Sequence, residues 1–168
     1  PEGFLPILKF IQKTLDSLAK KKLFDLFCGA GFFSLLFADF FEYVHGYDLV
    51  ESSVKRANIT AGKLYPGFPI RFEKKDLYQT LEEIRDSGIV DTESLILVDP
   101  PRAGIGKVLA EAILDSSASH VLYVSCNPNS QIQDLEILSK KYKVCSGLIT
   151  DPYPHTPHLE SVLLLERI

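Results

Sequence analysis

The sequence lacks the features that mark membrane and exported proteins. Its longest apolar stretch, residues 32–41, is interrupted by Ser34 and Asp39 and is far shorter than the roughly 20 residues that cross a bilayer. No basic stretch leads into an apolar one at the amino end, so the pattern of a signal peptide is missing as well. We therefore expect a cytoplasmic protein without a membrane-spanning helix.

Cysteine and methionine are scarce too. The three cysteines, Cys28, Cys126 and Cys145, have no CxxC spacing and cannot all pair, which argues against a disulfide scaffold and against zinc. His155 and His158 suggest a metal site, but the sequence places no third ligand with them, so we predict no metal. Methionine is absent even at the first position, and we therefore expect the chain to be a piece of a longer protein.

An excess of positive charge is also missing. Lys and Arg number 18 against 22 Asp and Glu, and the net charge of −4 has the wrong sign for holding a polyanion by charge alone. The 168 residues are 46% apolar and 24% charged, which is typical of a globular protein and excludes a disordered segment. We expect one monomeric domain over residues 1–168, and a nucleic-acid partner would need an anchor other than net charge.

Short apolar runs alternate with amphipathic stretches along the chain, the pattern of an α/β protein with a parallel sheet covered by helices. The pattern predicts strands over residues 23–27, 43–47, 70–73, 94–98, 120–124, 144–149 and 160–166. It predicts helices over residues 6–19, 32–40, 51–63, 77–85, 106–114 and 129–140. No helix separates the last two strands, so we expect them to pair antiparallel.

Glycines and acids follow the first three predicted strands, where the ligand crevice of a doubly wound sheet lies. Asp25-Leu-Phe-Cys-Gly-Ala-Gly supplies a turn whose backbone a ligand can approach closely, although a simple tight turn would also explain its glycines. Asp48 is placed to take the two ribose hydroxyls of a nucleoside, and Asp76 to meet an adenine edge. Ser34 stands where the dinucleotide fingerprint has its third glycine, which favours a single nucleoside such as S-adenosylmethionine.

Three further segments carry reactive side chains. In Asp99-Pro-Pro-Arg the prolines fix an extended turn that aims the carboxylate outward, unless the turn only stops a strand. Cys126 follows the next strand just ahead of a helix, whose amino-terminal dipole favours a thiolate; a small buried residue is the plain alternative. The proline-rich residues 152–159 form a rigid approach to Glu160, which is either a candidate base or a glutamate at the rim.

Together these residues resemble the S-adenosylmethionine-dependent RNA 5-methyluridine methyltransferases, which act on tRNA or ribosomal RNA. The glycine segment, continued by two phenylalanines, is similar to the cofactor motif of that family. Asp99-Pro-Pro-Arg-Ala-Gly, a spacer and residues 121–128 are similar to its nucleophile signature. Residues 151–160 are similar to its carboxy-terminal signature, so the resemblance covers the whole chain.

The resemblance implies a Rossmann-like class I methyltransferase fold, with a seven-stranded, mostly parallel sheet, an antiparallel last strand and helices on both faces. It implies that Cys126 adds to carbon 6 of uracil as the nucleophile and that Glu160 removes the proton from carbon 5 as the general base. Asp99 and Arg102 are expected at the pyrimidine. The predicted cofactor residues are Phe27, Gly29, Gly31, Phe32, Asp48 and Asp99, to which strand position adds Asp76.

The chain departs from the family pattern in a few places. Phe32 replaces a small polar residue, Ser130 a threonine, Gln133 an arginine and Tyr153 a phenylalanine, changes that concern contacts to cofactor and RNA. The front of the chain carries neither an OB-like RNA-binding module nor the family's Phe-Gln motif. We therefore expect the catalytic domain alone, without an amino-terminal RNA-binding region, and with weak RNA binding.

Three other functions fit parts of the sequence. An exocyclic amine methyltransferase also uses a loop of this type, but such sites usually place an aromatic residue where Arg102 stands, and they need no cysteine. A domain that binds S-adenosylmethionine without catalysis would not need Cys126 and Glu160. A NAD-linked oxidoreductase is disfavoured by the missing third glycine.

Overall fold

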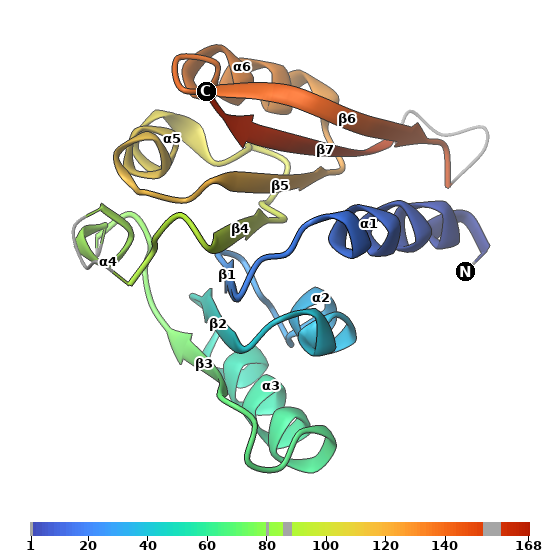
Figure 1. The fold of residues 1–168 in the computed structure, drawn as a ribbon, viewed down its shortest axis with the longest axis vertical. Coiled ribbons are helices and arrows are strands. Elements are labelled where there is room, and N and C mark those ends of the chain that lie inside the picture. The colour runs from blue at the N-terminus through green and yellow to red at the C-terminus, as the bar shows by residue number, and fades with distance from the viewer. Residues whose placement is uncertain (1, 80, 86–88, 153–158) are drawn as a thin grey trace.

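The computed structural model describes residues 2–79, 81–85, 89–152 and 159–168. Within them, seven strands form one sheet: β1 (Lys22–Asp25), β2 (Tyr43–Asp48), β3 (Ile70–Lys74), β4 (Ser94–Val98), β5 (His120–Ser125), β6 (Tyr142–Thr150) and β7 (Glu160–Arg167). Their order across the sheet is β3-β2-β1-β4-β5-β7-β6 (Figure 1). β1 to β5 run parallel, whereas β7 lies antiparallel between β5 and β6. The predicted α/β fold class and the antiparallel last strand are confirmed.

Helices cover both faces of this sheet (Figure 1). The helical elements are η1 (Glu2–Phe4), α1 (Leu5–Ser17), α2 (Phe32–Leu36), η2 (Ala38–Phe40), α3 (Glu51–Leu64), α4 (Glu82–Arg85), α5 (Gly106–Asp115) and α6 (Pro128–Leu138). Within the described part of the chain, none of the helices is long and apolar enough to cross a membrane.

The central strand β4 shows why the sheet is covered on both sides. Leu95 and Leu97 pack with side chains of α1 and α2, whereas Ile96 and Val98 pack with α5 on the other face. Successive side chains of a strand point to opposite faces, so a strand buried on both faces is apolar throughout.

Two predicted helices are shorter than expected. The helix predicted over residues 32–40 divides into α2 and the 3₁₀ turn η2, because the N–H groups of Phe40 and Phe41 bond three residues back rather than four. The helix predicted over residues 77–85 is reduced to α4. The Asp76 carboxylate accepts the Tyr78 N–H at 3.0 Å and holds this segment in a turn, which competes with helix formation.

The strand order reverses direction at the middle of the sheet. The chain proceeds outward from β1 through β2 to β3, then returns to place β4 on the other side of β1 and continues to β5. In open α/β sheets the ligand crevice lies outside the carboxyl ends of the strands at this switch point. The crevice is therefore expected where Asp25 and Val98 end β1 and β4.

Candidate active site

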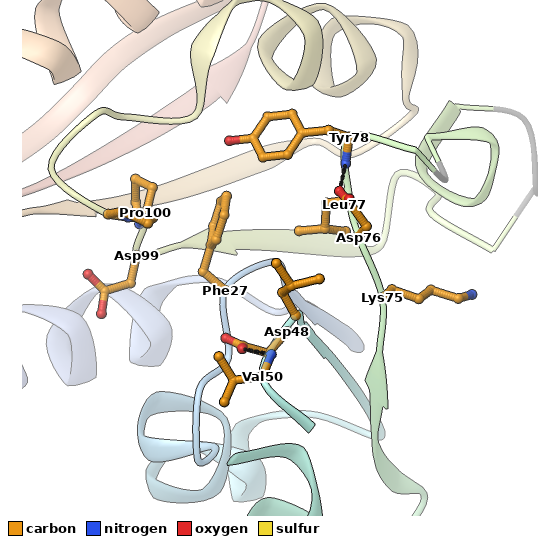
Figure 2. A pocket seen from close by; sticks show the side chains of 11 residues that line it. Phe27, Asp48, Val50, Lys75, Asp76, Leu77, Tyr78, Asp99 and Pro100 are labelled. Atoms are coloured by element: carbon orange, nitrogen blue, oxygen red, sulfur yellow. Dashed lines mark hydrogen bonds between the residues drawn. The ribbon is translucent and has the colours of Figure 1, made fainter. Parts of the chain in front are cut away.

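A cleft of about 500 Å³ opens at the switch point between β1 and β4 (Figure 2). Four of the predicted cofactor residues, Phe27, Asp48, Asp76 and Asp99, line it. The remaining lining residues come from the segments that follow β2, β3 and β4: Leu49, Val50, Lys75, Leu77, Tyr78, Pro100 and Pro101. The walls are largely apolar with carboxylates at separate points, a composition that suits a nucleoside.

Asp48 lines the cleft on the β2 side and accepts hydrogen bonds from two backbone N–H groups. One Asp48 carboxylate oxygen accepts the Gly29 N–H at 2.9 Å and the other accepts the Val50 N–H at 2.8 Å. Each oxygen keeps a second lone pair that a ligand hydroxyl can use. Gly29 has a φ of +53°, and a Cβ built there would meet no atom within 4 Å, so the backbone is left open to a ligand.

Gly31 and Phe32 have other surroundings. Gly31 has a φ of +83°, and a Cβ there would lie 2.9 Å from the Phe72 ring and 3.1 Å from Leu35, so its glycine is required by the packing of α2. Phe32 is 55% exposed and lines a separate apolar hollow between α2 and α3. Its ring meets the Phe4 ring edge-on at 6.3 Å between centroids. The structure thus does not bring Phe32 to the cleft.

Tyr78 crosses from the β3 side of the cleft to the β4 side. Its hydroxyl donates to the Ile105 carbonyl oxygen at 3.1 Å, while its N–H donates to Asp76 (Figure 2). Sequence reasoning missed Tyr78, and no local pattern would have found it, because its partner lies 27 residues further along the chain. Leu49 and Val50 were also missed, although two apolar residues directly after the predicted cofactor residue Asp48 were a usable signal.

The predicted transfer residues meet where β4, β5 and β7 lie side by side. Ser125 of β5 is paired with Ser161 of β7 in antiparallel register. Cys126 directly follows Ser125 and Glu160 directly precedes Ser161, and the charge of Glu160 raises the pKa of Cys126, so the two side chains lie near each other. Asp99 follows Val98 on β4, the next strand in the sheet. The structure thus brings Asp99, Cys126 and Glu160 to one edge of the sheet.

Burial and neighbouring acids hold protons at this edge. Burial raises the pKa of Asp99 to about 7, with further contributions from the charges of Asp25 and Glu160. Burial also raises the pKa of Asp25 to about 6, although the Ser34 hydroxyl donates to its carboxylate at 2.6 Å. Asp99 is thus close to half-ionised at neutral pH, when ordinary aspartates are fully charged.

The thiol of Cys126 is not the low-pKa group that its position ahead of a helix predicted. Burial and then the charge of Glu160 raise its pKa, Arg102 lowers it and Asp99 raises it again. The Asn127 side chain already caps α6 by accepting the Asn129 N–H at 3.3 Å, which satisfies part of the helix terminus. Burial and the surrounding acids thus oppose the lowering of the thiol pKa that is expected from the helix terminus and from Arg102.

Hydrogen bonds from neighbouring segments tie these loops together. The Asn127 side chain donates to the Arg102 carbonyl at 2.8 Å and joins the loop after β4 to the loop after β5. The Ser161 hydroxyl donates at 2.6 Å to Gln131, whose amide donates at 3.2 Å to the Tyr123 carbonyl. This bridge connects β7, α6 and β5 next to the pair of Cys126 and Glu160.

Among the described residues, no group of three or more His, Cys, Asp and Glu side chains could hold a metal ion. His155 and His158, the pair that suggested a metal, lie outside the described residues, as does Tyr153.

Comparisons with known proteins point to one family. A family model described as tRNA (uracil-5-)-methyltransferase matches residues 6–168. An uncharacterized RNA methyltransferase of Leptospira interrogans is 43% identical over 170 residues, which cover 99% of this chain and 37% of that protein. A tRNA/tmRNA (uracil-C(5))-methyltransferase of Nitratiruptor is 33% identical over 154 residues, which cover 86% of this chain and 42% of that protein.

A solved structure is similar as well. The crystal structure of Pyrococcus abyssi tRNA (uracil-54, C5)-methyltransferase, in complex with S-adenosyl-L-homocysteine, matches with a TM-score of 0.75 at 26% identity. The match covers 94% of this chain and 37% of that one, so the chain spans well under half the length of these relatives. Because the family model matches nearly every residue, including those around Asp99, Cys126 and Glu160, the chain belongs to the tRNA (uracil-5-)-methyltransferase family.

Proposed function

We propose that this chain is the catalytic domain of an enzyme that methylates carbon 5 of a uridine in tRNA or ribosomal RNA, with S-adenosylmethionine as the methyl donor. Membership of the family supports the reaction type. The meeting of Cys126 and Glu160 beyond the Ser125–Ser161 pair, with Asp99 on the next strand, is the observation that carries the proposal.

The cleft fits the proposed cofactor. Asp48 would accept hydrogen bonds from the ribose hydroxyls, and the open backbone at Gly29 beside it allows close approach. Asp76 lines the cleft on the β3 side, where it would meet the adenine edge. Phe27 and Tyr78 provide apolar walls for the nucleoside. When bound, S-adenosylmethionine supplies the electrophilic methyl group that carbon 5 of the uracil accepts.

Cys126 makes carbon 5 reactive. This carbon is a poor nucleophile until a group adds to carbon 6 of the ring. The Cys126 Sγ forms a bond to carbon 6, and the electron pair of the carbon 5–carbon 6 double bond moves toward the carbonyl oxygen at carbon 4 as an enolate. Because the pKa of Cys126 is raised, its proton must leave during addition, and the partly ionised Asp99 nearby is able to accept it.

Glu160 completes the reaction after methylation. Its carboxylate removes the proton of carbon 5, the electron pair re-forms the ring double bond, and the Sγ–carbon 6 bond breaks to release the thiolate. The charge of Glu160 acts on Cys126, so Glu160 lies near the ring that Cys126 would hold. Asp99 contacts the pyrimidine edge, and Arg102 lowers the pKa of the departing thiol.

RNA affinity is proposed to reside mainly outside this chain. The net charge of −4 opposes RNA binding, and the chain spans only 37% of the Leptospira relative. We expect the isolated chain to bind RNA at physiological salt far more weakly than the full-length protein does. Filter binding of both proteins measures this difference, and nanomolar binding by the isolated chain would contradict it.

The covalent step has a direct test. The full-length protein is incubated with S-adenosylmethionine and with tRNA or ribosomal RNA that contains 5-fluorouridine, and its intact mass is measured. Fluorine at carbon 5 cannot leave as a proton does, so we expect a methylated RNA–protein adduct that Cys126→Ala abolishes. Absence of the adduct, while the same protein binds cofactor and methylates ordinary RNA, would show that the reaction proceeds without the cysteine.

A further inference from the structure

A buried carboxylate in α6 holds the loop that follows β4. Asp134 is only 3% exposed, and its two oxygens accept the N–H groups of Ile105 at 2.8 Å and Gly106 at 3.0 Å. These amides begin α5, where the N-cap residue Ile105 has no side-chain acceptor of its own. Asp134 therefore caps α5 from 28 residues further along the chain, in a role that a local Ser, Thr, Asp or Asn usually fills.

The packing around Asp134 leaves little freedom. The Tyr123 hydroxyl donates to the same carboxylate at 2.5 Å, and Tyr123 is itself fully buried. Gly104 has a φ of +81°, and a Cβ there would lie 3.2 Å from the Asp134 Cγ and 3.2 Å from the Ser130 Cβ. The loop thus approaches α6 so closely that only glycine fits at this position.

The clamped segment lies between the two parts of the site. Upstream of Gly104, the same loop carries Asp99 and Arg102, while α6 begins directly after the Cys126 loop. Ile105 is also held from the cofactor side, since its carbonyl accepts the Tyr78 hydroxyl at 3.1 Å. The peptide groups around Ile105 therefore link the cofactor cleft, the Asp99 loop and the helix behind Cys126.

We propose that Asp134 is a positioning residue for methyl transfer, which holds the Asp99 loop in register with Cys126. This inference rests on the proposed function. Asp134 touches neither the cleft nor the reacting atoms, and it acts through the backbone of Ile105 and Gly106. A shift of the loop would separate Asp99 and Arg102 from the thiol. Gly29, in the turn after β1, and Asp48, at the end of β2, would keep their places.

The test compares Asp134→Asn with Glu136→Gln in the full-length protein. Asparagine has one acceptor oxygen, so its amide N–H groups must face one of the two backbone donors. Glu136 lies on the same helix but is exposed, which makes Glu136→Gln a control for the loss of one carboxylate. The measurements are turnover on RNA, the KM for RNA, the affinity for S-adenosylhomocysteine and amide hydrogen exchange over residues 101–107.

We expect Asp134→Asn to lower kcat at least about tenfold and to speed exchange in the loop, with the KM for RNA and the cofactor affinity within about threefold. Glu136→Gln is expected to change none of these. Tyr123→Phe is a milder variant that keeps both amide bonds, and it decides the question should Asp134→Asn not fold. For it we expect kcat to fall about two- to fivefold with unchanged cofactor affinity.

The remaining outcomes overturn the inference. If Asp134→Asn folds and its kcat stays within twofold of that of the control, Asp134 merely stabilises the fold. If only Tyr123→Phe folds, an unchanged kcat of that variant leads to the same conclusion. If cofactor affinity falls by the same factor as kcat, Asp134 serves the cofactor cleft instead. If the wild-type full-length protein binds cofactor but methylates no uridine RNA, the proposed function fails and this role fails with it.

Discussion

The two ends of the candidate active site are built differently. At the cofactor end, which comprises Gly29, Asp48 and Asp76, each carboxylate accepts backbone N–H groups from nearby turns. At the transfer end, which comprises Asp99, Cys126 and Glu160, the side chains come from the ends of three neighbouring strands, where burial and the charge of Glu160 raise the pKa of both Asp99 and Cys126. The difference shows that the cofactor end depends on local turns, whereas the transfer end depends on burial and on charges brought together by the sheet.

Substitution of the proposed nucleophile, Cys126, should show the largest difference between the effects on methyl transfer and on cofactor affinity. We expect Cys126→Ala to lower methyl transfer by at least about a thousandfold, because no other group would add to carbon 6. S-adenosylhomocysteine affinity should stay within about twofold, since the cofactor end is untouched. Radiolabel transfer and calorimetry measure both quantities, and Cys145→Ala, at an exposed cysteine on β6, is the control. Equal losses of methyl transfer and of S-adenosylhomocysteine affinity would contradict the division of the site into these two ends.

Substitution of the proposed general base, Glu160, should cause a smaller loss of turnover and should also change which species accumulates. We expect Glu160→Gln to slow turnover by about a hundredfold or more and to accumulate the adduct on ordinary uridine RNA, because the carbon 5 proton cannot leave. The substitution also removes a charge that raises the pKa of Cys126, so alkylation of Cys126 should begin at lower pH. Slow turnover without an accumulated adduct would show that Glu160 acts before methylation.

The buried acid of the transfer end should influence stability with pH. The pKa of Asp99 is about 7 in the folded protein and near 3.9 when unfolded, so the folded state binds its proton more tightly. Its contribution to the free energy of unfolding is therefore greatest below pH 4 and falls as the pH rises to about 7. As the pH rises from 5 to 8, we expect the free energy of unfolding of Asp99→Asn to increase by about 2 kcal/mol relative to that of the wild type. Denaturation of both proteins at a series of pH values measures this difference. The same pH dependence of the free energy of unfolding in both would contradict the raised pKa.

At the cofactor end, the expected effect is on affinity. Asp48→Asn removes one charge-assisted acceptor from the Gly29 and Val50 amides and from the proposed ribose contact. We expect S-adenosylhomocysteine to bind about tenfold more weakly, with kcat at saturating cofactor within about threefold. Glu51→Gln, at the neighbouring exposed acid, is the control. A large fall in kcat at saturation would show that the two ends are coupled.

Phe32 should have the smallest effect. Its side chain lines the hollow between α2 and α3 rather than the cleft, so Phe32→Ala is expected to change S-adenosylhomocysteine affinity by less than about twofold. Calorimetry measures the change. A tenfold loss would instead support the cofactor role that the family resemblance implies.

Strand positions explain how much of the site could be predicted. Asp48, Asp76 and Asp99 each lie at or just beyond the carboxyl end of a strand, and in a parallel sheet such residues meet at one edge. Their place in the cleft could therefore be expected from the sequence. Tyr78 and Asp134 carry no such signal, because their partners at Ile105 and Gly106 lie 27 to 29 residues away.

The sequence by itself determined the fold class and the reactive residue types. Apolar runs alternating with amphipathic stretches dictate a parallel sheet covered by helices. The motifs around Asp99, Cys126 and Glu160 are each a continuous run of residues, so each can be found in the sequence. Only the tertiary structure decided the raised pKa of Cys126, the place of Phe32 and the clamp formed by Asp134. Burial and through-space charge depend on which distant segments come into contact, and that is a property of the folded chain.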